Sequence, residues 1–216
     1  MLNGKHSIVY LINYKNNDFI NYKNYNNFLV KIKEIPDKLV KKQFLNRDLK
    51  ANFHKEVMAL AKLDKYSFIP KIIYYNSEKL SIIMEYIEGI NLKEFIDYLQ
   101  SFKNKLIVKR ILMKVYKILI KICIILDIEG IFKDEWNRPF KHVILNIKNN
   151  EIFKIYIIDF DRANFNKELR NLPQFLTFVF NNLGFSQYFY LIKEIAYFYR
   201  KIFKKYQNFR EYFNRV

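Results

Sequence analysis

The sequence predicts an α+β fold in which a small antiparallel sheet comes first and most of the helices follow. Two runs rich in β-branched and aromatic residues, Ser7 to Asn13 and Phe28 to Ile35, have the pattern of strands. A second pair, His142 to Ile147 and Ile152 to Ile158, flanks the turn residues Lys148-Asn149-Asn150 and predicts a hairpin. The intervening and following segments have apolar residues at helical spacing.

Helical periodicity marks five segments. Asn52 to Lys62 is short and amphipathic, with Glu56 as its only acid. The longest, Lys105 to Asp127, keeps apolar residues at helical spacing and is expected to form the buried spine of the helical part. The other three run over Leu92 to Leu99, Phe175 to Leu183 and Phe185 to Tyr206.

The composition argues against a disordered chain and raises the question of an anionic partner. Of the 216 residues, 51% are hydrophobic and 18% aromatic, enough for one large domain or two small lobes. The 38 Lys and Arg against 21 Asp and Glu give a net charge of +17, which attracts phosphates, nucleic acid or acidic proteins. The alternative is a solvated lysine-rich surface, because the abundant Ile, Lys, Asn, Tyr and Phe are typical of an A+T-rich genome.

Cysteine content and hydropathy predict a cytoplasmic protein with no membrane partner. Cys123 is the single cysteine and lies in the apolar run Ile122 to Leu126, so a disulfide framework is impossible. No signal peptide precedes the first strand-like run. The most apolar segment, Ile111 to Ile131, is interrupted by lysines and an aspartate and is too charged for a membrane span.

Two acidic clusters lie at the two ends of the predicted hairpin. Asp134-Glu135 precedes the first strand, and Asp159-Phe160-Asp161 follows the second. Because strand pairing brings the ends of a hairpin together, both clusters are expected to face one space. Hard divalent cations take oxygen ligands and bridge to phosphate oxygens. The arrangement therefore suits a metal ion and a phosphate.

The same stretch resembles the catalytic centre of a protein kinase. The run Ile157-Ile158-Asp159-Phe160-Asp161 is similar to the metal-binding D-F-G motif, with Asp in place of Gly. Lys133-Asp134-Glu135, followed by His142-Val143-Ile144-Leu145, is similar to a divergent catalytic loop. Glu135 stands for the catalytic Asp and His142 for the metal-binding Asn, and Arg138-Pro139 lengthens the loop by two residues. The chain most resembles small archaeal serine/threonine-kinase-like proteins and the atypical RIO and KEOPS-complex kinases.

Upstream motifs extend the resemblance to the phosphate-binding elements. F-L-V-K-I around Lys31 is similar to the V-A-I-K strand, with Lys33 as a reserve candidate, and Glu56 would pair with Lys31. Gly4, Lys5 and Ser7 belong to what resembles a reduced glycine-rich phosphate loop, although a frayed N-terminus is the alternative. These features imply that Lys31 binds the phosphates of a nucleotide.

The segment M-E-Y-I-E-G resembles the linker on the adenine side of the nucleotide. In that resemblance Met84 is a core residue, and Glu85 to Ile87 present backbone groups to the adenine edge. Gly89 allows the turn into the next helix.

The resemblance implies a two-lobed protein-kinase-like fold. Residues 1–88 would form the sheet-containing lobe with one key helix, and residues 89–216 a reduced helical lobe that includes the catalytic-loop hairpin. ATP would bind with Mg²⁺ or Mn²⁺, held by Asp159 and His142, and Glu135, with Asp134 as fallback, would accept a hydroxyl proton. The implied activity is phosphoryl transfer to a protein or RNA-associated acceptor, or slow ATP hydrolysis.

Two other function classes remain open. The departures at Lys133 and His142 favour a pseudokinase that binds a nucleotide or a partner without catalysis. The basic charge favours a module that binds RNA or a protein within a complex. Cations and rings alternate in the C-terminal segment: Arg200, Lys201, Lys204, Lys205, Arg210 and Arg215 with Tyr199, Phe203, Tyr206, Phe209, Tyr212 and Phe213. Alternatively, these rings are core, because Ile195, Ala196, Tyr199, Ile202, Phe203 and Tyr206 fit one buried helical stripe.

Overall fold

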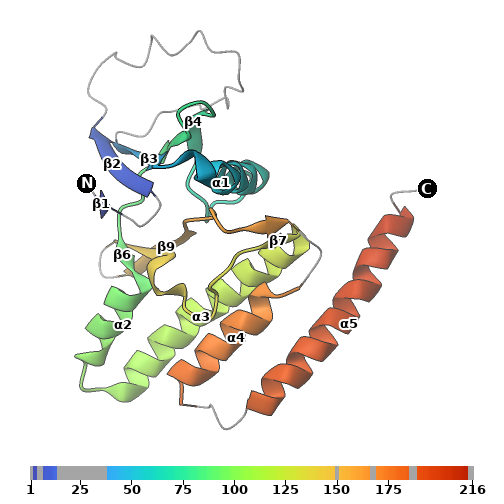
Figure 1. The fold of residues 1–216 in the computed structure, drawn as a ribbon. Coiled ribbons are helices and arrows are strands. Elements are labelled where there is room, and N and C mark those ends of the chain that lie inside the picture. The colour runs from blue at the N-terminus through green and yellow to red at the C-terminus, as the bar shows by residue number, and fades with distance from the viewer. Residues whose placement is uncertain are drawn as a thin grey trace. The chain divides into compact units, whose positions relative to one another are not determined.

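The computed structural model describes residues 2–3, 7–13, 38–148, 151–165, 169–184 and 189–213, which form an α+β fold (Figure 1). The chain divides into two compact units, Met1–Phe95 with Lys141–Ala163 and Ile96–Phe140 with Asn164–Val216. Within the described residues, no helix combines the length and the apolar character needed to cross a membrane.

The first unit is built on a five-stranded antiparallel sheet with the strand order β1-β2-β3-β5-β4. Strand β2 spans Ser7–Asn13, as the sequence predicted. The expected strand at Phe28 to Ile35 lies outside the described residues. The central strand, β3, follows Pro36 and was not recognised in the sequence. The remaining strands are β1 (Leu2–Asn3), β3 (Lys38–Phe44), β4 (Ile72–Asn76) and β5 (Ser81–Glu85).

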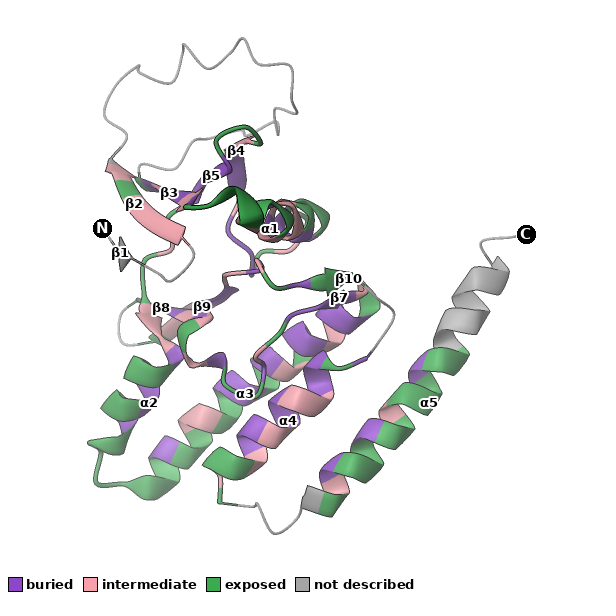
Figure 2. Ribbon diagram, in the orientation of Figure 1, coloured by how far each residue is buried: buried purple, intermediate pink, exposed green. Residues whose placement is uncertain are grey.

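Strand β3 sends its side chains to both faces of this sheet. Leu39 is fully buried in a cluster with Ile73 and Ile83. Phe44, five residues on and therefore on the other face, packs edge-on against Phe53 with ring centroids 5.8 Å apart. Phe53 belongs to helix α1 (Lys50–Lys62), which follows the short 3-10 helix η2 (Arg47–Leu49) and packs on this face. Both faces of β3 therefore contribute to the core (Figure 2).

The predicted hairpin is present as β8 (Val143–Lys148) and β9 (Glu151–Ile157), and β6 (Ile90–Asn91) pairs with β8. This hairpin belongs to the first unit, whereas the sequence assigned it to the helical part. The reason is hydrogen bonding: β6 pairs with β8, and the Ile157 amide donates to the Phe68 carbonyl oxygen over 2.9 Å. Gly89 permits this pairing, because a Cβ there would collide with the Leu145 carbonyl oxygen.

Helix α2 (Leu92–Gln100) crosses the boundary between the units, as does the short 3-10 helix η3 (Pro139–Lys141). The second unit contains α3 (Lys105–Ile128), α4 (Asn171–Asn182) and α5 (Phe189–Phe213), together with the short strand pair β7 (Ile131–Phe132) and β10 (Asn164–Phe165).

An aromatic core holds the helices of the second unit together. Helix α4 packs against both α3 and α5 (Figure 1). Phe175 of α4 is fully buried and meets Tyr116 of α3 and Trp136 edge-on, at centroid distances of 6.0 and 5.6 Å. Helix α4 begins four residues earlier than the sequence predicted, because its first amides find a partner in another helix, described below.

Candidate functional site

A buried lysine links three distant segments of the first unit. The Lys42 ammonium lies 2.5 Å from Oε2 of Glu56 and 2.7 Å from Oδ1 of Asp159. Lys42 is 6% exposed and Glu56 1%, whereas the Asp159 side chain is 38% exposed. The site is therefore closed on the side of Glu56 and open to solvent at Asp159.

The first two members are positioned by packing between β3 and α1. Lys42 and Phe44 are two residues apart on one strand and so face the same side. Phe53 and Glu56 are three residues apart on a helix and so share a face. The aromatic contact of Phe44 with Phe53 fixes the helix on the sheet, and the adjacent Lys42 and Glu56 then meet as an ion pair.

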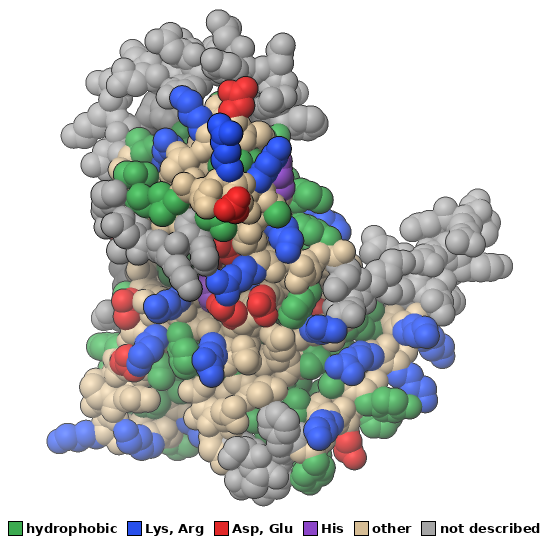
Figure 3. All heavy atoms as spheres, viewed as in Figure 1, with side chains coloured by type: hydrophobic (Ala, Val, Ile, Leu, Met, Phe, Trp, Pro, Cys, Tyr) green, Lys and Arg blue, Asp and Glu red, His purple; other side chains and the backbone are tan. Residues whose placement is uncertain are grey.

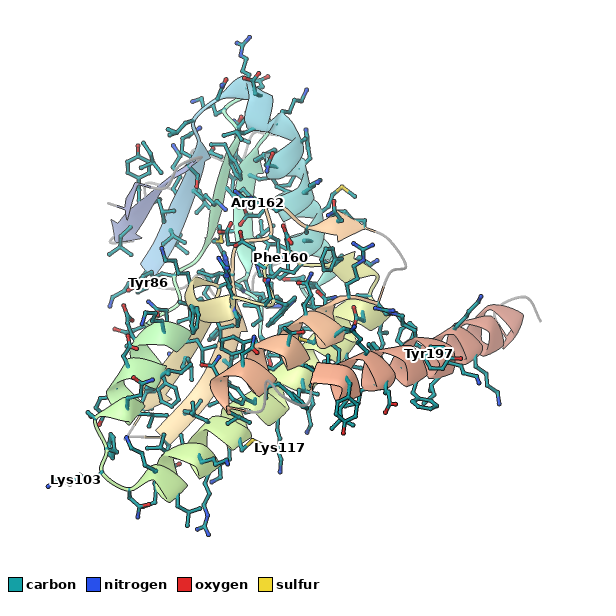
Figure 4. The ribbon with its side chains drawn as sticks, turned by 60° about the horizontal axis from the view of Figure 1, so that its bottom comes forward. Tyr86, Lys103, Lys117, Phe160, Arg162 and Tyr197 are labelled. Carbon is teal, nitrogen blue, oxygen red and sulfur yellow. The ribbon has the colours of Figure 1, made fainter. Side chains whose placement is uncertain are left out.

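Asp159 is held by the segment that follows β9. The Ile158 amide donates to the His142 carbonyl oxygen over 3.0 Å, and the Ala163 amide donates to that of Phe160 over 2.9 Å. The Phe160 side chain is fully buried. The Phe160 ring anchors the turn between Asp159 and Asp161. Figure 4 labels Phe160 and the neighbouring Arg162.

The backbone of Asp159 is in the left-handed region, with φ at 66°. Among the described residues, the other non-glycine positions with positive φ are Leu80 and Glu135. Two of these three positions are the acids that the sequence singled out for metal binding and proton transfer. A non-glycine residue in this region costs about 1–3 kcal/mol and persists when its surroundings enforce it, which is common at functional sites.

Burial and the neighbouring negative charges act in opposite directions on the pKa of Lys42. Burial by itself lowers the pKa of Lys42, but the charges of Glu56, Asp159 and Asp161 outweigh burial and raise that pKa. The ammonium therefore stays charged at neutral pH. Burial raises the pKa of Glu56, and the adjacent Lys42 charge only partly offsets this effect.

The lysine of this cluster is neither of the two that the sequence predicted. Lys31 and its reserve Lys33 lie outside the described residues, as do Gly4 and Lys5; Ser7 begins β2 and is half-buried. The partner of Glu56 in the structure is Lys42. A signal for it was available: Leu39-Val40-Lys41-Lys42 has the same apolar-then-lysine pattern and stands directly before the helix that carries Glu56.

The residues expected at the adenine edge lie at the end of β5. The Glu85 amide donates to the Lys71 carbonyl oxygen over 2.8 Å, so this donor is used within the fold. The Tyr86 amide similarly donates to the Lys38 carbonyl oxygen over 3.2 Å. Ile87 is half-buried. Because the amides of Glu85 and Tyr86 are both used within the fold, Ile87 is the better candidate of the three for a backbone contact to a base.

The predicted catalytic acids belong to the second unit. Oδ1 of Asp134 accepts a hydrogen bond from the Glu135 amide over 3.0 Å, and the Arg138 amide donates to the Glu135 carbonyl oxygen over 2.8 Å. Trp136 is buried beside them and packs on Phe175. The loop is thus anchored by a ring on one side and by a short turn on the other.

A buried polar network contacts the loop that carries Asp134 and Glu135 at Lys133. Oδ1 of Asp127 accepts from the amide and the side-chain Nδ2 of Asn171, at 3.2 and 2.6 Å. Oδ2 accepts from the Leu172 amide at 3.3 Å and from the Tyr199 hydroxyl at 2.9 Å. Asn171 in turn accepts from the Lys133 amide at 2.9 Å. No motif or periodicity in the sequence indicates this network, which caps α4 and connects the acid loop to α3, α4 and α5.

The donor set at Asp159 is compatible with a magnesium or manganese ion bound together with phosphates. Nδ1 of His142 lies 3.6 Å from Oδ2 of Asp159, so the two predicted ligands are adjacent. Among the described residues, no group of three or more His, Cys, Asp and Glu side chains is arranged to hold a metal. Mg²⁺ commonly uses only one or two carboxylates and completes its shell with waters and substrate phosphates.

Comparisons with known proteins supply no family. No protein-family model matches the chain, and no match was found among curated protein sequences.

Proposed function

We propose that the protein binds ATP with a divalent cation and transfers or hydrolyses its terminal phosphate, as a small, divergent relative of the protein kinases. The observation that carries this proposal is the Lys42 ammonium held between Glu56 of a helix and Asp159 of the segment after a hairpin. Protein kinases use a strand lysine, a helix glutamate and an aspartate before a phenylalanine in this order.

Each residue then has a role that its environment suits. Lys42 supplies a permanent positive charge for the nucleotide phosphates, and Glu56 fixes the direction of the ammonium. Asp159 would hold the cation, with His142 beside it, and that cation neutralises phosphate charge. Glu135, with Asp134 as fallback, would accept or orient the proton of an attacking hydroxyl or water. In this proposal Lys42 takes the role that the sequence analysis gave to Lys31.

The second candidate function is nucleotide binding without turnover. His142 stands where the resemblance expects a metal-binding amide, and imidazole is a poorer ligand for hard Mg²⁺ than oxygen. Nucleotide binding is common to both functions, and turnover separates them.

The decisive experiment measures ATP binding by isothermal titration calorimetry, with and without Mg²⁺ or Mn²⁺, for variants of the cluster. Asp159→Asn is expected to remove the metal-dependent part of binding, and Lys42→Met to weaken binding in either condition. Lys41→Met is the matched control, because Lys41 lies on the other face of the same strand. Lys31→Met compares the lysine chosen from the sequence with the one in the cluster.

The proposal is wrong if wild type binds no ATP, or if Lys41→Met weakens binding as much as Lys42→Met. Turnover is then followed as ADP release. Loss of turnover in Glu135→Gln, with binding unchanged, supports catalysis. ATP binding without any turnover in wild type selects the pseudokinase.

A further inference from the structure

Helix α3 has a continuous line of positive charge on its outer surface. Arg110, Lys114, Lys117 and Lys121 recur at i, i+4, i+7 and i+11, which places them on one face of the helix. All four are exposed, and Figure 4 marks Lys117, which projects away from the helix. With a rise of about 1.5 Å per residue the line is about 16 Å long. We call these four residues the α3 stripe.

The α3 stripe lies opposite the side of the helix that packs into the core. The buried apolar residues of α3 include Val108, Val115, Leu119, Ile122 and Leu126, which share the other face. Core packing therefore determines the direction of the stripe, and its side chains are presented to solvent by a well-anchored helix.

The stripe is not neutralised within the part of the chain that the structure describes. No Asp or Glu occurs between Lys105 and Leu126, and none of the ion pairs among the described residues includes a member of the stripe. Like charges three or four residues apart destabilise a helix. A bound polyanion would relieve this repulsion.

Exposed rings on α5 of the same unit indicate which polyanion fits. Tyr197 and Phe198 are 61% and 57% exposed, with ring centroids 5.6 Å apart. The exposed cations Arg200, Lys201, Lys204 and Lys205 follow within two turns. Figure 3 shows Lys and Arg side chains among apolar ones over the helices of this unit. Phosphate-binding cations together with solvent-exposed rings are the combination that binds unpaired nucleotides.

We propose that the helical unit binds single-stranded nucleic acid, with the α3 stripe on the phosphates and the α5 rings available to stack on bases. An acidic protein segment would satisfy the cations but has no bases on which Tyr197 and Phe198 could stack. An anionic membrane surface accepts both cations and aromatic side chains, so vesicle binding is one arm of the test. The proposal is independent of ATP binding in the first unit. It also goes beyond the charge of the C-terminal segment, because it assigns the main phosphate contacts to α3.

The test measures binding of a labelled single-stranded RNA of about 12 nucleotides by fluorescence anisotropy over a KCl series. Each phosphate contact on a single strand contributes about −0.7 to the slope of log K against log salt. The variant Lys114→Ala, Lys117→Ala, Lys121→Ala is therefore expected to flatten the slope by about 2. Circular dichroism verifies that α3 still forms, which is expected because the replaced side chains are exposed.

The control is Arg47→Ala, Lys50→Ala, Lys79→Ala, which removes the same charge from exposed positions of the first unit. Affinity should fall at least tenfold for the stripe variant and change little for this control. Tyr197→Ala with Phe198→Ala should weaken binding of the single strand but not of heparin, which has no bases.

Equal losses in the stripe variant and the control would show that only total charge matters and would overturn the proposal. The absence of RNA binding at low salt would overturn it as well. Binding to phosphatidylserine vesicles in preference to RNA would assign the stripe to a membrane surface instead. Equal affinity for a duplex of the same sequence, unaffected by loss of the rings, would contradict recognition of unpaired bases.

Discussion

Each unit of the molecule buries a carboxylate, and the two carboxylates are satisfied in different ways. In the first unit Glu56 is paired with the charged Lys42, which also contacts the partly exposed Asp159. In the second unit Asp127 is surrounded by neutral donors from Asn171, Leu172 and Tyr199. The first arrangement holds charge at an opening to solvent, and the second holds one fully enclosed charge.

This difference distinguishes the Lys42 cluster, a candidate binding site, from the Asp127 network, which stabilises the fold. A buried ion pair contributes little net stability, since desolvation cancels much of the Coulomb attraction, so its retention calls for another explanation. Binding of a phosphate and a cation at the open end of the Lys42 cluster is such an explanation. Hydrogen bonds from neutral groups to a buried carboxylate stabilise a fold, and here they join α3, α4 and α5 behind the loop that carries Glu135.

The largest expected effect is the loss of stability when Lys42 is removed from its ion pair with Glu56. Lys42→Met leaves the buried Glu56 without its cation and should lower the free energy of unfolding by about 3–5 kcal/mol. Urea unfolding at neutral pH measures the loss. Lys42→Met combined with Glu56→Leu should recover most of it, because two apolar side chains then replace two charges. No recovery in the double variant would show that the lysine stabilises the fold by other contacts.

The second prediction concerns the enclosed carboxylate. Asp127→Asn keeps the shape but turns one acceptor into a donor that faces the Leu172 amide. A buried donor without a partner costs about 1–3 kcal/mol. Urea unfolding should show this loss, whereas ATP binding by the first unit should be unchanged. A weaker ATP affinity in this variant would mean that the two regions are not separable in function.

The sequence predicted much of the fold. It predicted only part of the Lys42 cluster and little of the Asp127 network. Periodicity located α1, α3 and the β8–β9 hairpin to within two residues, because each has a long regular pattern. The order of Glu56, Asp134-Glu135 and Asp159 along the chain indicated the acidic residues. The sequence predicts Lys31 as the lysine, because F-L-V-K-I around it resembles the V-A-I-K strand and Phe28 to Ile35 has the alternation of a strand. Strand β3 has three lysines in seven residues, which hides its pattern.

The Asp127 network had no signal that periodicity could reveal. Its contacts join residues that are 38 to 72 positions apart, and the early start of α4 depends on those made by Asp127. The buried face that the sequence predicted for α5 is confirmed only in part. Ala196 and Phe203 are buried as expected, but Ile195 and Ile202 are 41% and 69% exposed. A helix at the edge of a layer has fewer neighbours than its apolar pattern suggests.

The third prediction tests whether α5 is tied to the acid loop through Tyr199. Tyr199→Phe removes one donor to Asp127 and should cost about 1 kcal/mol, close to the value of a single hydrogen bond. Amide hydrogen exchange should become faster at Lys133, which is held by Asn171 in the same network. Tyr197→Phe, at an exposed position of the same helix, is the control and should change neither quantity. Unchanged exchange at Lys133 in Tyr199→Phe would confine the tyrosine to packing.

The smallest expected effect is a pH dependence that belongs to Asp127. Burial raises the pKa of this carboxyl, and hydrogen bonds from Asn171, Tyr199 and Leu172 lower it only in part. The folded state therefore binds a proton that the unfolded state has already lost, over the range from the ordinary aspartate pKa near 4 up to the raised value.

Since stability falls with pH wherever the folded state binds more protons, Asp127 makes the protein less stable as pH rises through this range. Asp127→Asn has no such titration, so the difference in unfolding free energy between wild type and variant should shift towards the variant as pH rises through this range. Urea unfolding at closely spaced pH values measures this difference. A difference that moves in the opposite direction would mean that the donors outweigh burial and that the pKa of Asp127 is lowered in the folded protein.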